Sequence, residues 1–384
     1  MQILSTLFNE SGFRSLTWQN FVMFAVGGLL IYLAIRKGYE PLLLIPIGFG
    51  TILANLPHAM LAVSNSPVAA SGPIPPLLQL VYDAGIRTEF LPPVIFLGVG
   101  ALTDFRPLLS RPLTFLLGAA AQLGVFVAAA GGHYLLGFSP EESASIGIIG
   151  GADGPTTIYL TAILAPHLLG AVAVAAYSYM SLVPIIQPPV MRLLTTKRER
   201  AIDMPQAKPV SQVAVIAFPI ATAALASLAV PACAPLLGML MYGNLLRESG
   251  VTERLFKTAG GALINVVTMF LALVVGATME GVTFLRPQTL YILVLGAVAF
   301  IFSTAGGVLL AKALNLVLPK GHKINPCIGA AGVSAVPMSA RVVQTFVSNE
   351  TGGKVNPLMP AMGPNVAGVI GTAVAAGAFL ALLK

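Results

Sequence analysis

Charged residues are scarce in this sequence, and their scarcity excludes an ordinary soluble domain. Only 9% of the 384 residues are Asp, Glu, Lys or Arg, whereas a soluble domain usually carries about 25%. Hydrophobic residues make up 56% of the chain, so lipid is the expected solvent. The net charge of +7 lies mainly in loops, as is usual in membrane proteins, and does not indicate a nucleic-acid partner.

Cysteine and histidine are also rare, which argues against a transition-metal or redox centre. Cys233 and Cys327 are far apart and belong to no metal or redox pattern, so both are expected to serve packing. The four histidines share no spacing typical of metal ligands and are expected in loops or near lipid headgroups: His58, His133, His167 and His322.

Long apolar runs are abundant. Several approach or exceed the roughly 20 residues that span a bilayer, among them Phe21–Ile35, Pro112–Phe138, Ile146–Leu164 and Gln288–Leu310. The sequence therefore predicts an all-α polytopic membrane protein with ten to twelve transmembrane helices. Its 39 glycines and 29 prolines favour a transporter with interrupted helices, because helix breakers in lipid need protein partners or a wet cavity.

A basic loop divides the chain into two halves. We expect a first repeat with an N-terminal helix over 1–190, a linker over 191–209 and a second repeat over 210–384. The positive-inside rule predicts that the linker is cytoplasmic, since it holds a cluster of basic residues: Arg192, Lys197, Arg198, Arg200 and Lys208.

The two halves carry the same landmarks in the same order. Arg111-Pro112 and Gly131-Gly132 recur as Arg286-Pro287 and Gly306-Gly307. The Gly-rich stretch Ile146–Pro155 likewise has a counterpart in Ile328–Pro337. Close helix packing explains one such stretch but not an ordered set. An internal repeat is therefore predicted, with its binding site near the midplane, and we expect the two copies to be inverted.

Asp153 is the one acidic residue in the middle of an apolar run. No other charged residue occurs between Glu142 and Arg192, and a carboxylate in the bilayer centre costs about 2.5–3.5 kcal/mol on insertion scales. Asp153 can also cap a half-helix, a role compatible with ion binding. One carboxylate among neutral oxygens suits a small hard cation.

Neutral and basic partners for Asp153 occur in the second half. Asn325, Ser334 and Asn365 lie in Gly/Pro-rich stretches and offer neutral oxygens, although Asn365 also suits a helix N-cap. Arg341 suits a carboxylate, or else a snorkelling position at the interface. Tyr177 and Tyr179 fit packing as well as function. The stretch 64–76, rich in Ser, Pro and Gly, predicts an exposed loop outside the ion path.

These motifs resemble the β subunits of sodium-pumping oxaloacetate, methylmalonyl-CoA and glutaconyl-CoA decarboxylases. The resemblance runs from about residue 20 to the end of the chain and is carried by long, specific stretches: Glu40–Gly50, Gly98–Phe105, Gly147–Tyr159, Ala176–Pro189, Gly243–Ser249, Asn325–Arg341 and Ala361–Gly371.

The resemblance implies roles for individual residues. Asp153 and Asn365 match positions for sodium coordination. Five further positions match those tied to sodium or proton movement and to decarboxylation: Tyr179, Asn325, Gly329, Ser334 and Arg341. We therefore expect sodium to be coordinated by Asp153, Asn365, Asn325, Gly329 and Ser334. Catalysis is expected to involve Arg341, Ser334 and Tyr179. Arg341 is also expected to bind the carboxylate of carboxybiotin.

The resemblance also implies an assembly in a prokaryotic cell membrane. A carboxyltransferase α subunit loads biotin on a carrier protein or domain, and the membrane subunit decarboxylates carboxybiotin, takes up a proton from the far side and exports sodium. The family fold is two inverted repeats forming a scaffold and a moving, elevator-like core, in trimers with a small single-span γ or δ subunit. This chain has no biotin-attachment lysine of its own.

Two other functions fit the repeat and Asp153. One is a sodium-coupled symporter of an organic anion, which only the extended family motifs disfavour. The other is a passive channel, which paired broken helices make a weaker hypothesis. The carboxyl donor is chosen by the carboxyltransferase and is not encoded in this chain.

Overall fold

The computed structural model describes residues 11–57, 77–204 and 209–384. Within these ranges every regular element is a helix, which confirms the predicted all-α class. The predicted loop at 64–76 lies outside the described residues, as does Lys208 of the basic linker.

Seven helical segments of the described chain are long and apolar enough to cross a membrane. A bent pair, Leu77–Arg87 and Leu91–Leu102, meets at 66° and raises the number to eight if it forms one span. The ten to twelve spans expected from the sequence are not confirmed and stay a prediction. One shorter apolar helix, α3 (Pro41–Ala54), is also present. The seven segments are α2 (Trp18–Lys37), α7 with α8 (Thr114–Ala121, Leu123–Leu136), η5 with α11 (Pro166–Leu168, Leu169–Leu194), α13 (Gln212–Ala229), α15 with η7 and α16 (Glu253–Thr258, Ala259–Leu263, Ile264–Ala277), α18 (Pro287–Val317) and α20 (Leu358–Leu383).

Glycines bring helices of the two halves into direct backbone contact. A Cβ on Gly50 of α3 would overlap a carbonyl oxygen of α16, and one on Gly276 of α16 would overlap a carbonyl of α3. Gly100 of α5 (Leu91–Leu102) and Gly243 of α14 (Ala234–Glu248) form a second crossing of the same kind. Each crossing joins one helix from either side of the linker, so the halves interlock rather than form separate domains.

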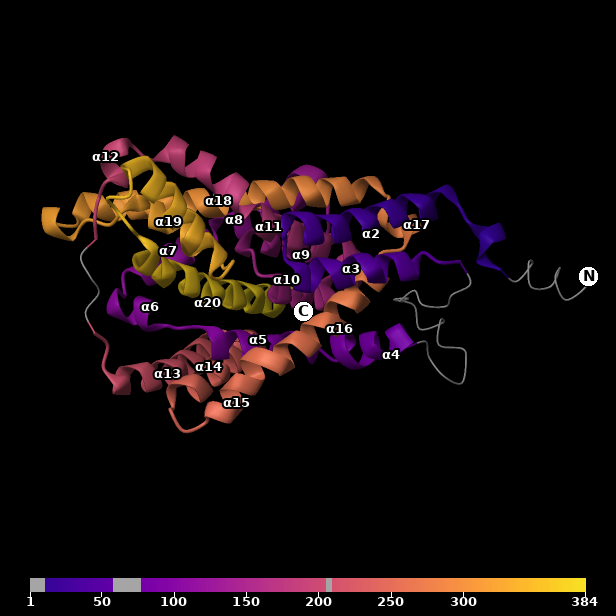
Figure 1. The fold of residues 1–384 in the computed structure, drawn as a ribbon, viewed down its shortest axis with the longest axis horizontal. Helices are drawn as coiled ribbons and strands as arrows, with labels where there is room; N and C mark the ends of the chain where they lie inside the picture. Colours follow the sequence, from indigo (N-terminus) through magenta and orange to yellow (C-terminus); the bar gives the residue numbers. More distant parts are fainter. Residues whose placement is uncertain (1–10, 58–76, 205–208) are drawn as a thin grey trace, which may run out of the picture.

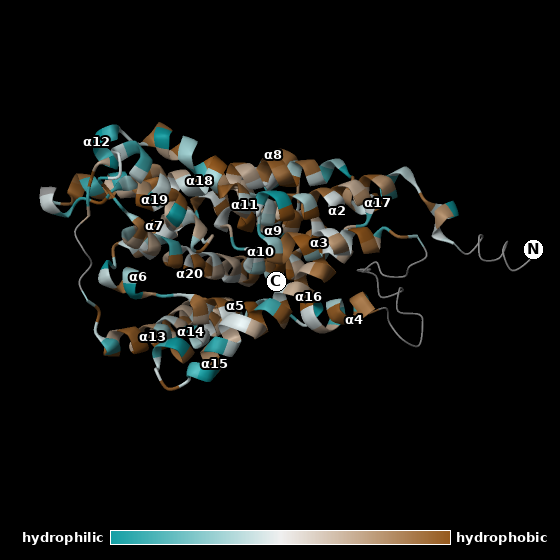
Figure 2. Cartoon of the chain, in the orientation of Figure 1, coloured by the Kyte–Doolittle hydropathy of each residue, from teal (hydrophilic) through white to brown (hydrophobic). Residues whose placement is uncertain are grey.

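The most buried long helices are α11, α18 and α20, whereas α2 and α13 are largely exposed. Apolar exposed side chains on α2 and α13 suit contact with lipid. Figure 1 shows α12 (Lys197–Arg200) and α19 (Met338–Thr351) at one end of the molecule and α17 (Gly281–Phe284) at the other. Figure 2 shows hydrophilic residues gathered at α12 and α15 and hydrophobic residues along the long helices. The chain is a multi-pass membrane protein. Figure 1 shows α2, α18 and α20 running along one direction and α16 crossing obliquely.

Candidate cation site and the pockets on either side

The Gly-rich stretch of the first half forms a helical hairpin. α9 (Pro140–Gly147) and η4 (Ile148–Gly151) lead inward, and α10 (Gly154–Leu164) leads back. The chain turns at Ala152, whose φ of 54° is uncommon for a residue with a Cβ. The open ends meet where Glu142 Oε1 lies 2.8 Å from His167 Nε2. The run Ile146–Leu164, predicted as a possible span, is therefore broken in the middle at a hairpin tip.

The corresponding stretch of the second half forms a second hairpin. η9 (Pro326–Gly332) leads inward, and α19 leads back after a turn at 333–337. Both open ends contact Arg200: Asn325 Nδ2 donates to its carbonyl oxygen at 2.9 Å, and Glu350 Oε2 lies 2.7 Å from its Nη1. Arg200 follows the C-terminal end of α11, whereas His167 precedes the N-terminal end. The two hairpins thus open at opposite ends of α11.

The tips of the two hairpins are joined by hydrogen bonds. The backbone N–H and the Oγ of Ser334 both donate to the carbonyl oxygen of Gly151, at 2.9 and 2.8 Å. α20 packs across this junction, and Asn365 Nδ2 donates to the carbonyl oxygens of Ala331 and Val333 at 3.0 and 2.8 Å. Ser334, Asn365 and the turn before Asp153 therefore belong to one connected structure.

In this geometry Asp153 can both cap a helix and bind a cation. It is buried and serves as the N-cap of α10, with Oδ1 accepting a long 3.4 Å hydrogen bond from the Thr156 N–H. Its other oxygen, Oδ2, is buried without a hydrogen-bond partner. Capping thus uses one oxygen of the carboxylate and leaves the second available to a ligand.

Four buried oxygens near the tips are unpaired in the described structure. They are Asp153 Oδ2, Thr156 Oγ1, the Tyr177 hydroxyl and Asn365 Oδ1. An unsatisfied buried polar group costs about 1–3 kcal/mol, and carboxylate, hydroxyl and amide oxygens are the donors that hard cations prefer. Unpaired oxygens on Asn244 and Ser303 lie on other helices, α14 and α18. The described residues contain no cluster of three or more His, Cys, Asp or Glu that could hold a metal.

Asn325 and Gly329 lie away from the tips. Both polar ends of the Asn325 side chain are occupied, because Nδ2 also reaches the Ile202 carbonyl and Oδ1 caps the Cys327 N–H. Gly329 lies at a close backbone crossing with Gly307 of α18, where a Cβ on either residue would overlap the other's carbonyl oxygen. This conformation gives both residues structural roles, and their predicted part in sodium binding stays a prediction.

The two tyrosines of α11 face different neighbours. Tyr179 donates its hydroxyl to the Leu293 carbonyl of α18, so it does not share the predicted site in this conformation. Tyr177 is fully buried, its ring fills the space beside Gly154, and its hydroxyl has no hydrogen-bond partner. Positions two apart on a helix point about 200° apart, and the sequence alone could not decide which tyrosine faces Asp153.

Arg341 lines a pocket of about 470 Å³ at the linker end of the molecule. The side chain is exposed, and no hydrogen bond or ion pair of its guanidinium occurs within the described residues. The walls are formed by α11 and α19 and include Pro184, Pro188, Met338, Val342 and Phe346. A free guanidinium at the mouth of an apolar pocket can bind a carboxylate on an apolar carrier.

Glu350, whose carboxylate is bonded to two arginines, lines one side of this pocket. Glu350 accepts from Arg192 at 2.9 Å and from Arg200 at 2.7 Å. The hydrogen bond from Arg192, and to a smaller extent the one from Arg200, holds the pKa of Glu350 below its usual value. The neighbouring arginines are thereby paired with protein, which leaves Arg341 as the pocket's available cation among the described residues.

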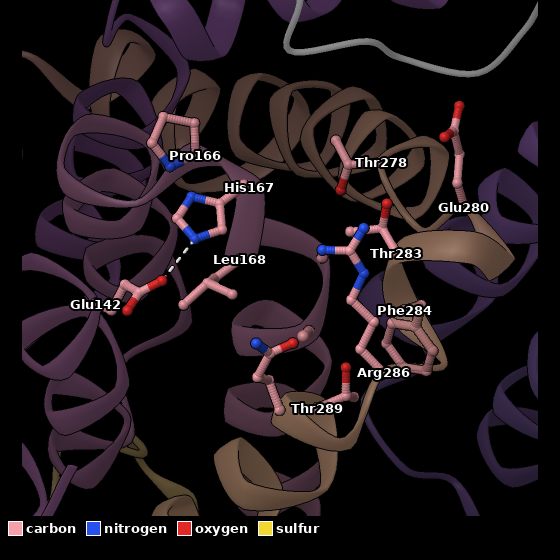
Figure 3. A pocket seen from close by; sticks show the side chains of 13 residues that line it. Glu142, Pro166, His167, Leu168, Thr278, Glu280, Thr283, Phe284, Arg286 and Thr289 are labelled. Atoms are coloured by element: carbon pink, nitrogen blue, oxygen red, sulfur yellow. Dashed lines mark hydrogen bonds and ion pairs between the residues drawn. The ribbon is translucent and has the colours of Figure 1, made fainter. Parts of the chain in front are cut away.

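A second pocket, of about 530 Å³, lies at the opposite end of α11. Figure 3 shows Glu142 and His167 on one wall and Thr283 and Arg286 on the other. Burial raises the pKa of Glu280, which lies in the turn before α17. Along α11, Gly170 of this pocket and Pro188 of the Arg341 pocket are roughly 27 Å apart. The hairpin tips lie between the two pockets.

Sequence reasoning missed several polar residues around the tips. Thr156 is the third residue after Asp153, so the capping pattern could have identified it. Thr372 of α20 donates to Gln122 Oε1 at 3.3 Å and to the Gly368 carbonyl at 2.9 Å. No local pattern marks Gln122 or Thr372, because only the packing of α20 against α7 brings them together.

Comparison with known proteins gives the family. The model of the Na+-transporting oxaloacetate decarboxylase beta subunit matches residues 19–383. The chain is 56% identical to the methylmalonyl-CoA decarboxylase subunit beta of Veillonella parvula, over 99% of this chain and 98% of the relative. It is 55% identical to the glutaconyl-CoA decarboxylase subunit beta of Acidaminococcus fermentans, covering 99% and 97%.

More distant relatives include the oxaloacetate decarboxylase beta chain 2 of Salmonella typhi, which is 48% identical over 99% of both chains. The three relatives differ in the acid or acyl-CoA in their names, yet each matches nearly the whole chain. Together with the family model, they show that this chain belongs to the β-subunit family of the sodium-transporting decarboxylases.

Proposed function

We propose that this chain decarboxylates carboxybiotin presented by a partner and couples the reaction to sodium export. The observation that carries the proposal is the junction of the two hairpin tips, where Asp153 Oδ2 and Asn365 Oδ1 are buried and unpaired. A sodium ion coordinated there would satisfy both oxygens. Ser334 would support the ion indirectly, since its hydroxyl and N–H hold the two tips together.

The Arg341 pocket is the proposed place of decarboxylation. Arg341 would hold the carboxylate of carboxybiotin at the pocket mouth, while the ring would lie against Pro184 and Pro188. In the reaction the bond from the biotin nitrogen to the carboxyl carbon breaks, carbon dioxide leaves, and the nitrogen takes a proton. Apolar walls favour this step because the carboxylate loses its charge. Tyr179 and Ser334 remain candidates for proton transfer.

The two hairpins suit alternating access. They open at opposite ends of α11, as expected for inverted repeats, and their tips meet at the proposed ion site. We infer a moving core that carries the site past a scaffold between the Arg341 pocket and the opposite pocket. The proton consumed in decarboxylation would arrive from the side opposite the linker.

The proposed assembly contains a carboxyltransferase α subunit, a biotin carrier protein or domain and a small single-span γ or δ subunit, with this chain as a homotrimer. The basic linker would face the cytoplasm of a prokaryotic cell, with the chain in the inner or plasma membrane. The relatives' names give three candidate carboxyl donors: oxaloacetate, methylmalonyl-CoA and glutaconyl-CoA.

The test is sodium transport by the co-purified complex in proteoliposomes, supplied with each of the three donors in turn. We expect one donor to drive sodium uptake together with carbon dioxide release, and avidin to stop both by sequestering biotin. Sodium movement driven by an organic anion without carbon dioxide release, and unaffected by avidin, would instead identify a symporter and contradict the proposal.

A further inference from the structure

The Arg341 pocket and the hairpin junction are separated by apolar side chains. Met338 and Val342 line the pocket and also pack against a buried cluster on its inner side. That cluster includes Ala152, beside Asp153, and Val333, beside Ser334. The same two side chains thus touch the pocket on one side and the surroundings of the proposed ion site on the other.

Several helices contribute to this separation. Met180, Val183 and Ile186 of α11 occur at intervals of three residues and belong to the same cluster, so they share one face of that helix. Phe300 of α18 is fully buried within it. We name Met338, Val342, Met180, Val183, Ile186 and Phe300 the apolar layer. Every member lacks an oxygen in its side chain that could coordinate a cation.

The polar neighbours of the apolar layer are already bonded to each other. Gln187 Nε2 donates to Ser339 Oγ at 2.7 Å and to the Ala330 carbonyl at 2.8 Å. Ser339 Oγ in turn donates to Gln187 Oε1 at 3.1 Å. Both side chains are fully buried. A cation leaving the junction toward the Arg341 pocket would therefore lose its water without gaining new ligands.

The position of Arg341 links the apolar layer to the pocket's ligand. Met338, Arg341 and Val342 are at i, i+3 and i+4 of α19, so they occupy one face of the helix. A carboxylate bound by Arg341 acts on the same helical turn that carries Met338.

We propose that Met338 and Val342 form an apolar gate between the Arg341 pocket and the cation site. The gate keeps ions from crossing unless a carboxylate is bound in the pocket. Hydrophobic constrictions stop ions because the narrow apolar space does not hold water. The consequence for coupling rests on the proposed function: an open gate would let sodium return, so that decarboxylation continued with less net transport. The barrier itself depends only on the packing.

Accessibility of a reporter thiol behind the gate tests the barrier directly. Val333→Cys places a small thiol in the buried cluster, in a full-length chain whose Cys233 and Cys327 are changed to Ala. Inside-out membrane vesicles expose the linker face to a small cationic methanethiosulfonate. We expect Met338→Gln and Val342→Thr, which keep the side-chain size but add polarity, to speed labelling by roughly tenfold.

Matched apolar variants separate polarity from packing damage. Met338→Leu and Val342→Ile should leave the labelling rate within about twofold of the parent chain. Met359→Gln on the exposed face of α20 should also have no effect. Equal labelling of Val333→Cys in the parent, the Gln and the Thr variants would overturn the gate, and so would fast labelling in the parent.

A second measurement tests the consequence for coupling. In the assembled complex, the sodium transported per carbon dioxide released should fall by at least about half in Met338→Gln, whatever the variant's rate of carbon dioxide release, as expected for a wetted constriction. An unchanged ratio would contradict the role in coupling. If the parent complex released no carbon dioxide with any donor while the Gln variant still sped labelling, the proposed function would fail and the gate would stand.

Discussion

At the scale of single residues, Asp153 combines a helix cap with an unpaired buried oxygen. We expect Asp153→Asn to lower the affinity for sodium roughly 10- to 100-fold, since an interaction with a charged group is worth about 1.5–3 kcal/mol. Folding should persist, because Asn caps helices as well as Asp. Sodium-dependent turnover in proteoliposomes measures the effect.

Asp203→Asn is the matched control, because Asp203 is exposed in the linker and the same change there should leave sodium dependence unaltered. An Asp153→Asn variant that pumps with the parent's half-saturation would show that the ion binds elsewhere.

Arg341 is the corresponding residue on the substrate side. Lys retains the charge but cannot form two parallel hydrogen bonds with one carboxylate. We expect Arg341→Lys to reduce carboxybiotin decarboxylation at least about tenfold, as followed by carbon dioxide release. Arg198→Lys in the exposed part of the linker should have no effect. Near-normal turnover of the Arg341→Lys variant would mean that the side chain only reaches toward the interface.

The sequence predicted these residues to different extents, for physical reasons. Asp153 is recognisable because a lone carboxylate in an apolar run is costly. Asn325 resembles Asn365 in its Gly/Pro-rich setting, yet the fold places it at the open end of a hairpin, against the linker. Tyr177 faces Gly154 while Tyr179 faces α18, and this difference depends on the rotation of α11, which the two-residue spacing does not fix.

At the scale of elements, the second hairpin depends on the crossing of η9 with α18. A Cβ on Gly329 would overlap the Gly307 carbonyl, and backbone cannot move aside as a side chain can. We expect Gly329→Ala to destabilise the protein by about 1–3 kcal/mol, as overpacking does, and to lower its unfolding midpoint in detergent.

Gly28→Ala is the matched control, since a Cβ at Gly28 of α2 meets nothing within 4 Å. That change should be neutral or slightly stabilising. If Gly329→Ala abolished transport while the unfolding midpoint stayed at the parent's value, the residue would act in the ion path rather than in packing.

The open end of the second hairpin should make stability depend on pH. The pKa of Glu350 is lowered in the folded protein by Arg192 and Arg200, so its contribution is present above the unfolded-state pKa of about 4.3. That contribution is lost as the pH falls through the lower folded-state pKa. Glu350→Gln should therefore lower the unfolding midpoint at pH 7, and the difference from the parent should shrink under acid conditions.

Glu253→Gln is the control for this pH experiment, because Glu253 pairs with Lys257 at an exposed position and exposed pairs contribute little. A difference between Glu350→Gln and the parent that did not change with pH would mean that the carboxylate's charge is not what stabilises the hairpin.

The elements themselves were only partly predictable. Long apolar runs identify α18 and α20, because a helix needs roughly 20 consecutive, mainly apolar residues to cross a bilayer. The same reasoning counted Ile146–Leu164 as a possible span, although the chain reverses at Ala152. The reversal is stabilised by contacts from distant segments, such as Ser334 with Gly151, and a hydropathy window contains no information about such contacts.

At the scale of the whole molecule, the internal repeat predicted from the sequence would explain why the proposed ion site lies between two pockets. Each half supplies one hairpin, and the hairpins open at opposite ends of α11. The Arg341 pocket is therefore next to the linker, and the pocket of Glu142 and His167 is at the far end. In the proposed mechanism, the junction of the tips would couple chemistry at one pocket to ion exchange at the other.

This arrangement predicts that protons and sodium compete for one carboxylate. Asp153 has a single unpaired oxygen, and a carboxyl group that holds a proton no longer offers a full negative charge to a cation. Binding of either ligand must therefore weaken binding of the other by the same factor. We expect acidification from about pH 8 to about pH 6 to raise the sodium concentration for half-maximal turnover, by at most about tenfold per pH unit.

The measurement is sodium-dependent carbon dioxide release by the assembled complex across that pH range, with the carboxyltransferase step assayed separately so that its own pH dependence can be divided out. Saturating sodium should restore the rate wherever acid affects only binding, because excess cation displaces the proton from Asp153. The Asp153→Asn variant, which has no titrating group at this position, should retain whatever pH dependence arises elsewhere and lose the competitive part. A sodium half-saturation that stayed constant from pH 8 to pH 6 in the parent would place proton uptake on another group, such as the Tyr179 or Ser334 hydroxyl, even if Asp153 still bound sodium.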